Sequence, residues 1–242
     1  MFFDPLYLII MLTCLALSAV TSLRVKAAFA QGKKTAVSSG VTGAEAAARI
    51  LKANGIFDVK IIEGKGFLTD HYNPATKNLV LSPDVYRGSS AASVGVAAHE
   101  VGHAVQHATG YRWLGLRTAL VPVVNIGSNI GLWLVIIGII LGSAYQASSG
   151  NLSIGYYLAL TGVILYSATF VFSVVTVPVE IDASRRAVRE LEADGITRSA
   201  EETEAVRKVL SAAALTYVAA AIGSLLQLAY WVLRSGILNR RD

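Results

Sequence analysis

The sequence is poor in cysteine, histidine and charge. Cys14 is the only cysteine among 242 residues, so the chain can form no intramolecular disulfide and no cysteine-based zinc site. Charged residues make up 15% of the chain and hydrophobic residues 54%, a balance that excludes an ordinary soluble domain. The sequence contains no basic patch interleaved with aromatic residues, so the net charge of +5 does not indicate nucleic-acid binding.

Long, nearly uncharged hydrophobic runs explain this composition. Four of them are long enough to cross a lipid bilayer, namely 2–23, 114–144, 154–177 and 210–233. The second run contains Pro122, which could divide it into two helices. We therefore predict a mainly α, multi-pass membrane protein with about four transmembrane helices and a small α+β, zincin-like catalytic domain at the membrane surface.

These runs divide the chain into five expected segments. They are an N-terminal transmembrane anchor (1–23), a cytoplasmic α+β segment (24–112), a transmembrane hairpin (113–178), a helix (179–209), and a fourth transmembrane helix with the tail (210–242). Basic residues concentrate between the first and second runs and again between the third and fourth. The positive-inside rule therefore predicts a cell-membrane protein with a cytoplasmic catalytic domain and both termini outside. The uncharged loop 143–153 fits this orientation, whereas the tail, with Arg234, Arg240 and Arg241, fits it poorly.

The α+β segment shows local signals for short elements. Thr42 is placed to cap a helix over 42–54. Short strands are expected over 59–63 and 77–82, with a turn at Asn73-Pro74 between them. A longer helix follows, with Ser89 or Ser90 as N-cap and Gly110 just past its end.

That last helix carries His99-Glu100-Val101-Gly102-His103, a motif of the form His-Glu-x-x-His. Its two histidines lie four residues apart on one helix face and can bind one Zn²⁺, with Glu100 placed to act as general base. The other residues of 94–108 are nearly all Val, Ala or Gly, so the helix is expected to be buried, and its ionisable groups then need a partner or a metal. The alternative is a pair of hydrogen-bonded core histidines.

A catalytic zinc ion needs a third protein ligand, for which the candidates include His71, His107, Glu180 and Asp182. His107 continues the i, i+4 series, but on a regular helix it lies about 12 Å along the axis from His99, too far to share one ion. We expect His107 to support a ligand or to be a packed polar residue.

Glu180 is the preferred third ligand. Pro178 suits the first turn of a further helix, on which Glu180 shares a face with apolar residues. Asp182 is expected on the other side of that helix, paired with Arg186 at i+4. A preceding transmembrane hairpin would return Glu180 to the membrane face of His103. The alternative is that Glu180 caps the N-terminus of this helix, where the dipole favours a carboxylate.

Four blocks of sequence therefore stand out together. They are the motif at 99–103, the segment EIDASRRA that begins at Glu180, and the blocks LTDHYNP (68–74) and LSPDVY (81–86). With these blocks, nearly the whole chain resembles the bacterial family of membrane-bound neutral zinc metallopeptidases. The resemblance implies a gluzincin-type membrane protease with one Zn²⁺ per chain, held by His99, His103 and Glu180, and with Glu100 as the base.

A more distant similarity is to the membrane proteases related to the CAAX prenyl endopeptidase and the heat-shock membrane protease. Those proteins carry Glu-x-x-x-Asp, whereas here Ser184 stands in place of the aspartate. Asp182 and Asp70 are candidates to replace that carboxylate behind the metal ligands. The donor that stabilises the tetrahedral oxyanion is also open: His71, Tyr86 and Tyr111 are candidates, and the preferred interpretation of His71 is a hydrogen-bonded turn residue.

We predict an endopeptidase that hydrolyses peptide bonds of proteins near the membrane, with a protein or peptide substrate and the lipid bilayer as partners. The alternative is a catalytically weak or inactive zinc-binding scaffold that regulates other membrane proteins. A transporter or channel is disfavoured, because the runs hold no charge apart from Asp4 and Arg117 near their ends. Gly127-x-x-x-Gly131 and Gly138-x-x-x-Gly142 favour close helix packing, which we expect within the chain; the alternatives are an interface with a membrane-protein partner or in a homo-oligomer.

Overall fold

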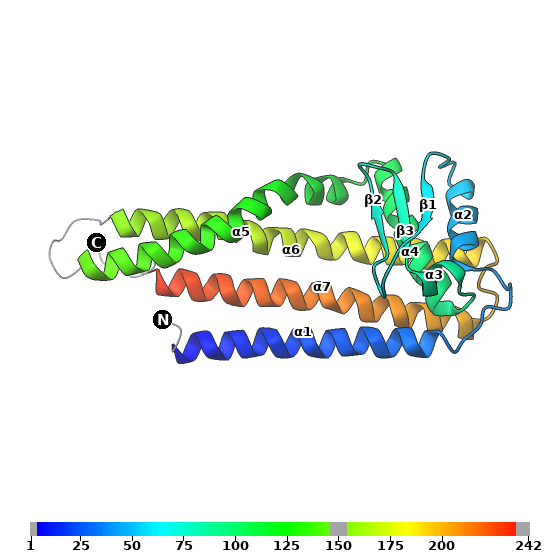
Figure 1. Cartoon of the computed structure of the whole chain (residues 1–242), viewed down its shortest axis with the longest axis horizontal. Helices are drawn as coiled ribbons and strands as arrows, with labels where there is room; N and C mark the ends of the chain where they lie inside the picture. Colours follow the sequence, from blue (N-terminus) through cyan, green and yellow to red (C-terminus); the bar gives the residue numbers. More distant parts are fainter. Residues whose placement is uncertain (1–3, 146–153, 236–242) are drawn as a thin grey trace. The chain divides into compact units, whose positions relative to one another are not determined.

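A computed structural model describes residues 4–145 and 154–235 (Figure 1). In these ranges the order of elements is α1 (Pro5–Gly32), α2 (Gly43–Ala53), β1 (Lys60–Glu63), β2 (His71–Asn73), β3 (Asn78–Leu81), α3 (Pro83–Arg87), α4 (Ala91–Ala108), α5 (Arg112–Tyr145), α6 (Ile154–Ala193) and α7 (Ala200–Arg234). Helices α1, α5, α6 and α7 are long and apolar enough to cross a membrane. The prediction of a mainly helical membrane protein with four long apolar helices and a small sheet is confirmed.

The chain forms two compact units. The helical unit comprises Met1–Ser18, Leu116–Val177 and Tyr217–Asp242, and the mixed unit comprises Ala19–Gly115 and Pro178–Thr216. Every residue predicted for the metal site belongs to the mixed unit.

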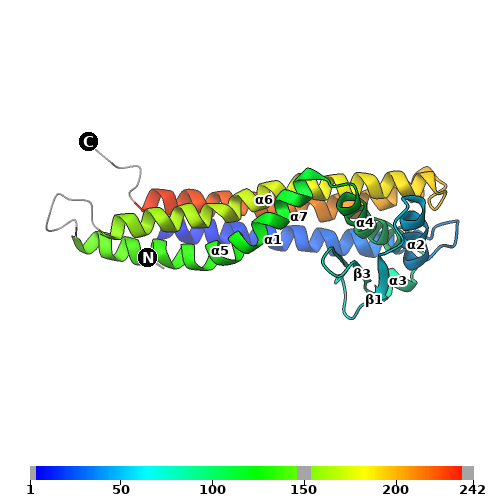
Figure 2. The same ribbon diagram turned by 90° about the horizontal axis from the view of Figure 1, so that it is seen from above.

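Glycines set the packing of α5 on α6 in the helical unit. A Cβ atom at Gly131 would lie 2.9 Å from the carbonyl oxygen of Gly162, and one at Gly138 would lie 2.4 Å from the backbone nitrogen of Ala159. Any larger side chain would therefore push the two backbones apart. Figure 2 shows α5 and α6 side by side, so the glycine motifs serve packing within the chain, as predicted.

The sheet of the mixed unit is mixed in direction, with strand order β1-β3-β2. Strand β1 pairs parallel to β3, with Lys60 opposite Asn78, and β2 pairs antiparallel to β3, with His71 opposite Val80. Two of the strands lie where the sequence predicts them. Strand β2 was missed, because three residues are too few to carry an alternating pattern and Asn73 indicated a turn.

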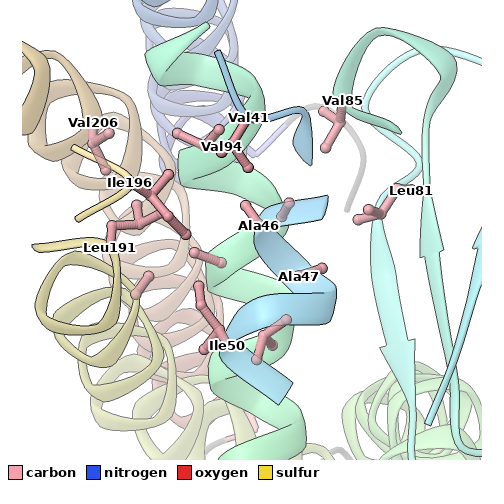
Figure 3. Close-up of a cluster of buried hydrophobic side chains, with 14 of the residues drawn as sticks. Val41, Ala46, Ala47, Ile50, Leu81, Val85, Val94, Leu191, Ile196 and Val206 are labelled. Carbon is pink, nitrogen blue, oxygen red and sulfur yellow. The ribbon is translucent and has the colours of Figure 1, made fainter. Parts of the chain in front are cut away.

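Helix α2 packs against α4 to form the core of the mixed unit. The predicted N-cap is confirmed as a capping box: the Thr42 hydroxyl accepts from the Glu45 backbone N–H at 3.3 Å, and the Glu45 carboxylate accepts from the Thr42 N–H at 2.9 Å. In Figure 3, Ala46, Ala47 and Ile50 of α2 lie against α4. This contact holds one side of α4 in place.

Three helix boundaries differ from those expected from the sequence. Helix α6 runs unbroken through Pro178, which therefore does not begin a new helix, and Glu180 lies inside α6 and does not cap an N-terminus. Proline costs a helix one N–H donor, and long apolar helices tolerate that loss where neighbouring groups satisfy the freed carbonyl. Helix α5 likewise continues through Pro122, and α1 continues to Gly32, past the predicted end of the anchor. Most of the loop 143–153, together with Arg240 and Arg241, lies outside the described residues.

Candidate metal centre

Helix α4 begins and ends as its sequence predicts. The Ser90 side chain accepts a hydrogen bond from the Ser93 N–H at 3.2 Å, which caps the N-terminus. At the other end Gly110 has φ +63°, a left-handed conformation that a Cβ atom disfavours. The N–H of Tyr111 then donates to the carbonyl of Gln106 at 2.9 Å, which closes the last turn.

Helices α4 and α6 bring three potential metal ligands together. The Nε2 atom of His99 lies 3.2 Å from Oε2 of Glu180, and Nε2 of His103 lies 3.5 Å from the same oxygen. One donor atom from each residue lies within 4.8 Å of the other two. The Glu180 side chain is only 3% exposed, so its negative charge is buried beside two imidazoles. Such a carboxylate requires a cationic partner.

Gly102 permits this close approach of the two helices. A Cβ atom at this position would lie 2.7 Å from the carbonyl oxygen of Ala183 on α6. Because the obstructing atoms are backbone, they could not move aside without shifting the helix. The second variable position of the His-Glu-x-x-His motif therefore sets the distance between the histidines and Glu180.

The ring of His103 is oriented by Gln106, one turn further along α4. Gln106 is fully buried, and its amide nitrogen donates to the Val179 carbonyl and to the Asp182 carboxylate, both at 2.8 Å. Its amide oxygen, which can only accept, then faces Nδ1 of His103 at 3.0 Å. The neutral ring of His103 therefore carries its proton on Nδ1 and offers the lone pair of Nε2 to a metal, whereas a protonated ring donates from Nε2 to Glu180.

Burial and neighbouring charges act in opposite directions on His103. Burial lowers the pKa of this imidazole, but the hydrogen bond to Glu180 and the negative charges of Glu100 and Glu180 together outweigh burial. The pKa of His103 therefore lies above its ordinary value. The same negative field that favours a proton on this imidazole would favour a metal cation beside it.

The ring of His99 has a neutral partner. Its Nδ1 atom lies 3.1 Å from the hydroxyl oxygen of Ser184, one turn beyond Glu180 on α6. Ser184 therefore contacts the outer nitrogen of His99. This is the nitrogen that a carboxylate often contacts behind a metal-binding histidine.

The position of Asp182 differs from the prediction in one respect. Its expected ion pair with Arg186 is present at 2.6 Å, but its carboxylate also reaches α4 and accepts from Gln106. It is therefore connected to the histidines, although the sequence placed it on the opposite side of the helix. The Arg186 guanidinium lies 5.7 Å from the centre of the Tyr111 ring, which places Tyr111 beside this polar cluster.

Glu100 is held by the sheet. Its Oε2 atom accepts from the backbone N–H of Tyr72 in β2 at 3.0 Å. Asp70, just before β2, accepts from the backbone N–H of Ser82 at 2.7 Å and from its hydroxyl at 3.1 Å. Burial raises the pKa of Asp70, and the nearby charge of Glu100 raises it further, against the opposing effect of the Ser82 hydrogen bonds. Asp70 thus lies near the glutamate, and its carboxylate is held by Ser82.

The remaining candidates make their contacts with other residues. His107 pairs through Nδ1 with the Tyr72 hydroxyl at 2.9 Å, and Nδ1 of His71 lies 2.8 Å from the Thr69 carbonyl oxygen. Tyr86 lies in α3, partly buried against the apolar core. The functions of these three residues stay predictions.

Sequence reasoning missed Gln106 and the backbone N–H of Tyr72. Gln106 did carry a signal, since it is a polar residue three positions after His103 in a stretch of α4 that is otherwise almost wholly apolar. The Tyr72 N–H carried none, because every residue but proline has one.

The three side chains suit a zinc ion. Two imidazole nitrogens and one carboxylate oxygen form a donor set typical of catalytic zinc, which keeps a fourth position for water. The hydrogen bonds behind both histidines meet the further requirement that each ligating ring be oriented through its other nitrogen.

Comparison with known proteins agrees with this chemistry. A family described as "Putative neutral zinc metallopeptidase" matches residues 7–236. A protein of Bacillus subtilis (strain 168), described as "Putative membrane protease YugP", is 44% identical over 237 residues, which cover 98% of this chain and 99% of the relative. No solved structure matches the chain significantly.

Proposed function

The chain belongs to this family of neutral zinc metallopeptidases, and from that premise we propose that it is a membrane-embedded endopeptidase with one zinc ion held by His99, His103 and Glu180. The observation that carries the proposal is the convergence of the three donor atoms within 4.8 Å. The orientation of His103 by Gln106 supports it, because only Nε2 of that ring is then available to a metal.

Zinc bound at this site would supply a Lewis acid that makes water nucleophilic near neutral pH and polarises the scissile carbonyl. Glu100 would accept the proton of the attacking water and deliver it to the leaving amine. One carboxylate oxygen of Glu100 is fixed by the Tyr72 N–H, which orients the other oxygen for this transfer. Ser184 and Gln106 would hold the two imidazoles in position.

The substrate is proposed to be a protein or peptide at the membrane surface. Strand β2 lies at one edge of the sheet, and its backbone contacts Glu100 directly. An extended peptide that adds to this edge would therefore run past the general base. The basic residues of the mixed unit favour a cytoplasmic location for this site.

Zinc content of the full-length protein, purified in detergent, tests the ligand set. Wild type is expected to hold about one zinc ion per chain, and Glu180→Ala is expected to lose it. His107→Ala is the matched control, since His107 lies one turn beyond the motif but contacts Tyr72. A zinc ion that survives Glu180→Ala but not His107→Ala would overturn the assignment.

An assay for cleavage of an unfolded protein by the same preparation then distinguishes a zinc peptidase from a non-catalytic scaffold. Turnover by wild type that chelation abolishes and added zinc restores is the expected result. A preparation that binds about one zinc ion per chain but cleaves no protein would favour the non-catalytic scaffold. Ser184 is compatible with that alternative, because it stands where the distantly similar proteases carry an aspartate.

A further inference from the structure

A groove lies between α6 and α7 within the mixed unit; none of the three ligands lines it, and Ser184 is the residue that it shares with the surroundings of His99. Its volume is about 380 Å³, which is within the range of small-molecule sites. Its apolar lining comes from Ile181, Val188, Leu210 and Ala214. Its polar lining is three arginines, one glutamate and two serines (Arg185, Arg189, Arg207, Glu192, Ser184, Ser211).

The groove lies where each helix changes from uncharged to charged. On α6 no residue of 154–177 is charged, and on α7 no residue of 209–233 is charged. Stretches of this length can cross the hydrocarbon core of a bilayer. The groove residues follow after the first stretch and span the beginning of the second, so we expect them near the level at which a bilayer presents its phosphate groups.

The end of the groove nearest the uncharged stretch of α6 is apolar, and two arginines follow it along the helix. Ile181 lies at the end nearest the uncharged stretch of α6, and Ala214 lies within the uncharged stretch of α7. Arg185 follows Ile181 by about one helical turn and Arg189 by about two, both in the direction away from the uncharged stretch. The groove therefore matches a molecule that has an apolar tail toward the membrane and an anionic head away from it.

The positive charge of the groove is only partly neutralised. Arg207 pairs with Glu192 at 3.3 Å, and Arg189 pairs with its neighbour Glu190 at 2.9 Å, but the arginine of each pair is more than half exposed, so these contacts are weak. Arg185 is exposed and has no carboxylate at ion-pair distance among residues 4–145 and 154–235. Guanidinium groups suit phosphate well, because they can donate two parallel hydrogen bonds.

We propose that this groove binds an anionic glycerophospholipid, with an acyl chain against Ile181 and Ala214 and the phosphate at Arg185 and Arg189. The proposal does not depend on peptidase activity, and its test requires neither zinc nor substrate.

Native mass spectrometry of the full-length protein in detergent provides the test, with phosphatidylglycerol and phosphatidylcholine of identical acyl chains as probes. The first phosphatidylglycerol is expected to bind more tightly than phosphatidylcholine. The double variant Arg185→Gln, Arg189→Gln is expected to weaken phosphatidylglycerol binding by at least about fivefold. Ala214→Trp, which fills the apolar part of the groove without changing its charge, is expected to weaken the binding of both lipids.

A matched control removes equal charge elsewhere. Lys208 and Arg49 are exposed and do not line the groove, so Lys208→Gln with Arg49→Gln is expected to leave binding within about twofold of wild type. An equal loss in this control would show that diffuse surface charge attracts the lipid and would overturn the proposal. Unchanged lipid binding in Ala214→Trp would also overturn the proposal, and so would full displacement of the lipid by soluble glycerol phosphate. Either result would show that the protein binds only the phosphate group and not the acyl chain. Unchanged circular dichroism of each variant checks the fold.

Discussion

Nδ1 of His103 lies 3.0 Å from the amide oxygen of Gln106, and this contact selects the tautomer of the histidine. Two oxygens, one from the backbone and one from Asp182, occupy the amide nitrogen of Gln106 and prevent the amide from turning over. A residue three positions beyond the motif thereby determines which nitrogen of His103 faces Glu180.

Gln106→Leu is therefore expected to weaken zinc binding by about 10- to 100-fold, because the ring of His103 loses its orienting acceptor. Zinc affinity is measured by competition with a chromophoric chelator. Gln31→Leu, on an exposed position of α1, is the control and should bind zinc as wild type does. Wild-type affinity in Gln106→Leu would show that the amide does not position the ring.

Gly102→Ala is expected to destabilise the protein by about 1–3 kcal/mol, because its Cβ would meet the backbone of Ala183 at 2.7 Å. Zinc affinity should fall with it, since α4 and α6 must separate. Gly95→Ala in the same helix is a matched control: its Cβ would meet a methyl group of Val206 at 3.1 Å, and that side chain can adjust. Thermal unfolding followed by tryptophan fluorescence compares the two variants, and equal effects would contradict the special role of Gly102.

Ser184→Ala is expected to lower zinc affinity by about tenfold, because Nδ1 of His99 loses its hydrogen-bond partner. Ser184→Asp should bind zinc at least as well as wild type, since a carboxylate accepts the same N–H more strongly. Ser211→Ala, whose hydroxyl contacts a backbone carbonyl of α7, serves as the control. The assignment fails if the alanine variant at 184 retains full affinity in the chelator competition.

Glu100→Gln is expected to keep the zinc ion and to lower kcat by about 10²- to 10⁴-fold, because an amide cannot accept the proton of the attacking water. The Tyr72 N–H can still donate to the amide oxygen, so the side chain should stay in place. Zinc content and peptide turnover are measured on one preparation. Turnover near the wild-type rate would contradict the assignment of Glu100 as the general base.

The sequence by itself determined what depends on local spacing. Four hydrophobic runs predicted four long helices, and Gly110 predicted a helix end. Thr42 predicted one helix start and the pair Ser89 and Ser90 another, since these signals act within one or two turns. The motif placed His99, Glu100 and His103 on one helix for the same reason. The spacing of apolar residues after Pro178 also favoured Glu180 over Asp182 as the neighbour of the histidines, because Glu180 lies on the apolar face of its helix.

The tertiary structure decided what depends on contacts between distant segments. Helix α6 passes through Pro178 without a break, which a local rule for proline could not anticipate. Gln106 is held by residues more than seventy positions away, and Glu100 by the backbone of a three-residue strand. Such contacts form only when helices and strands pack, because burial leaves each polar group to find its partner within the fold.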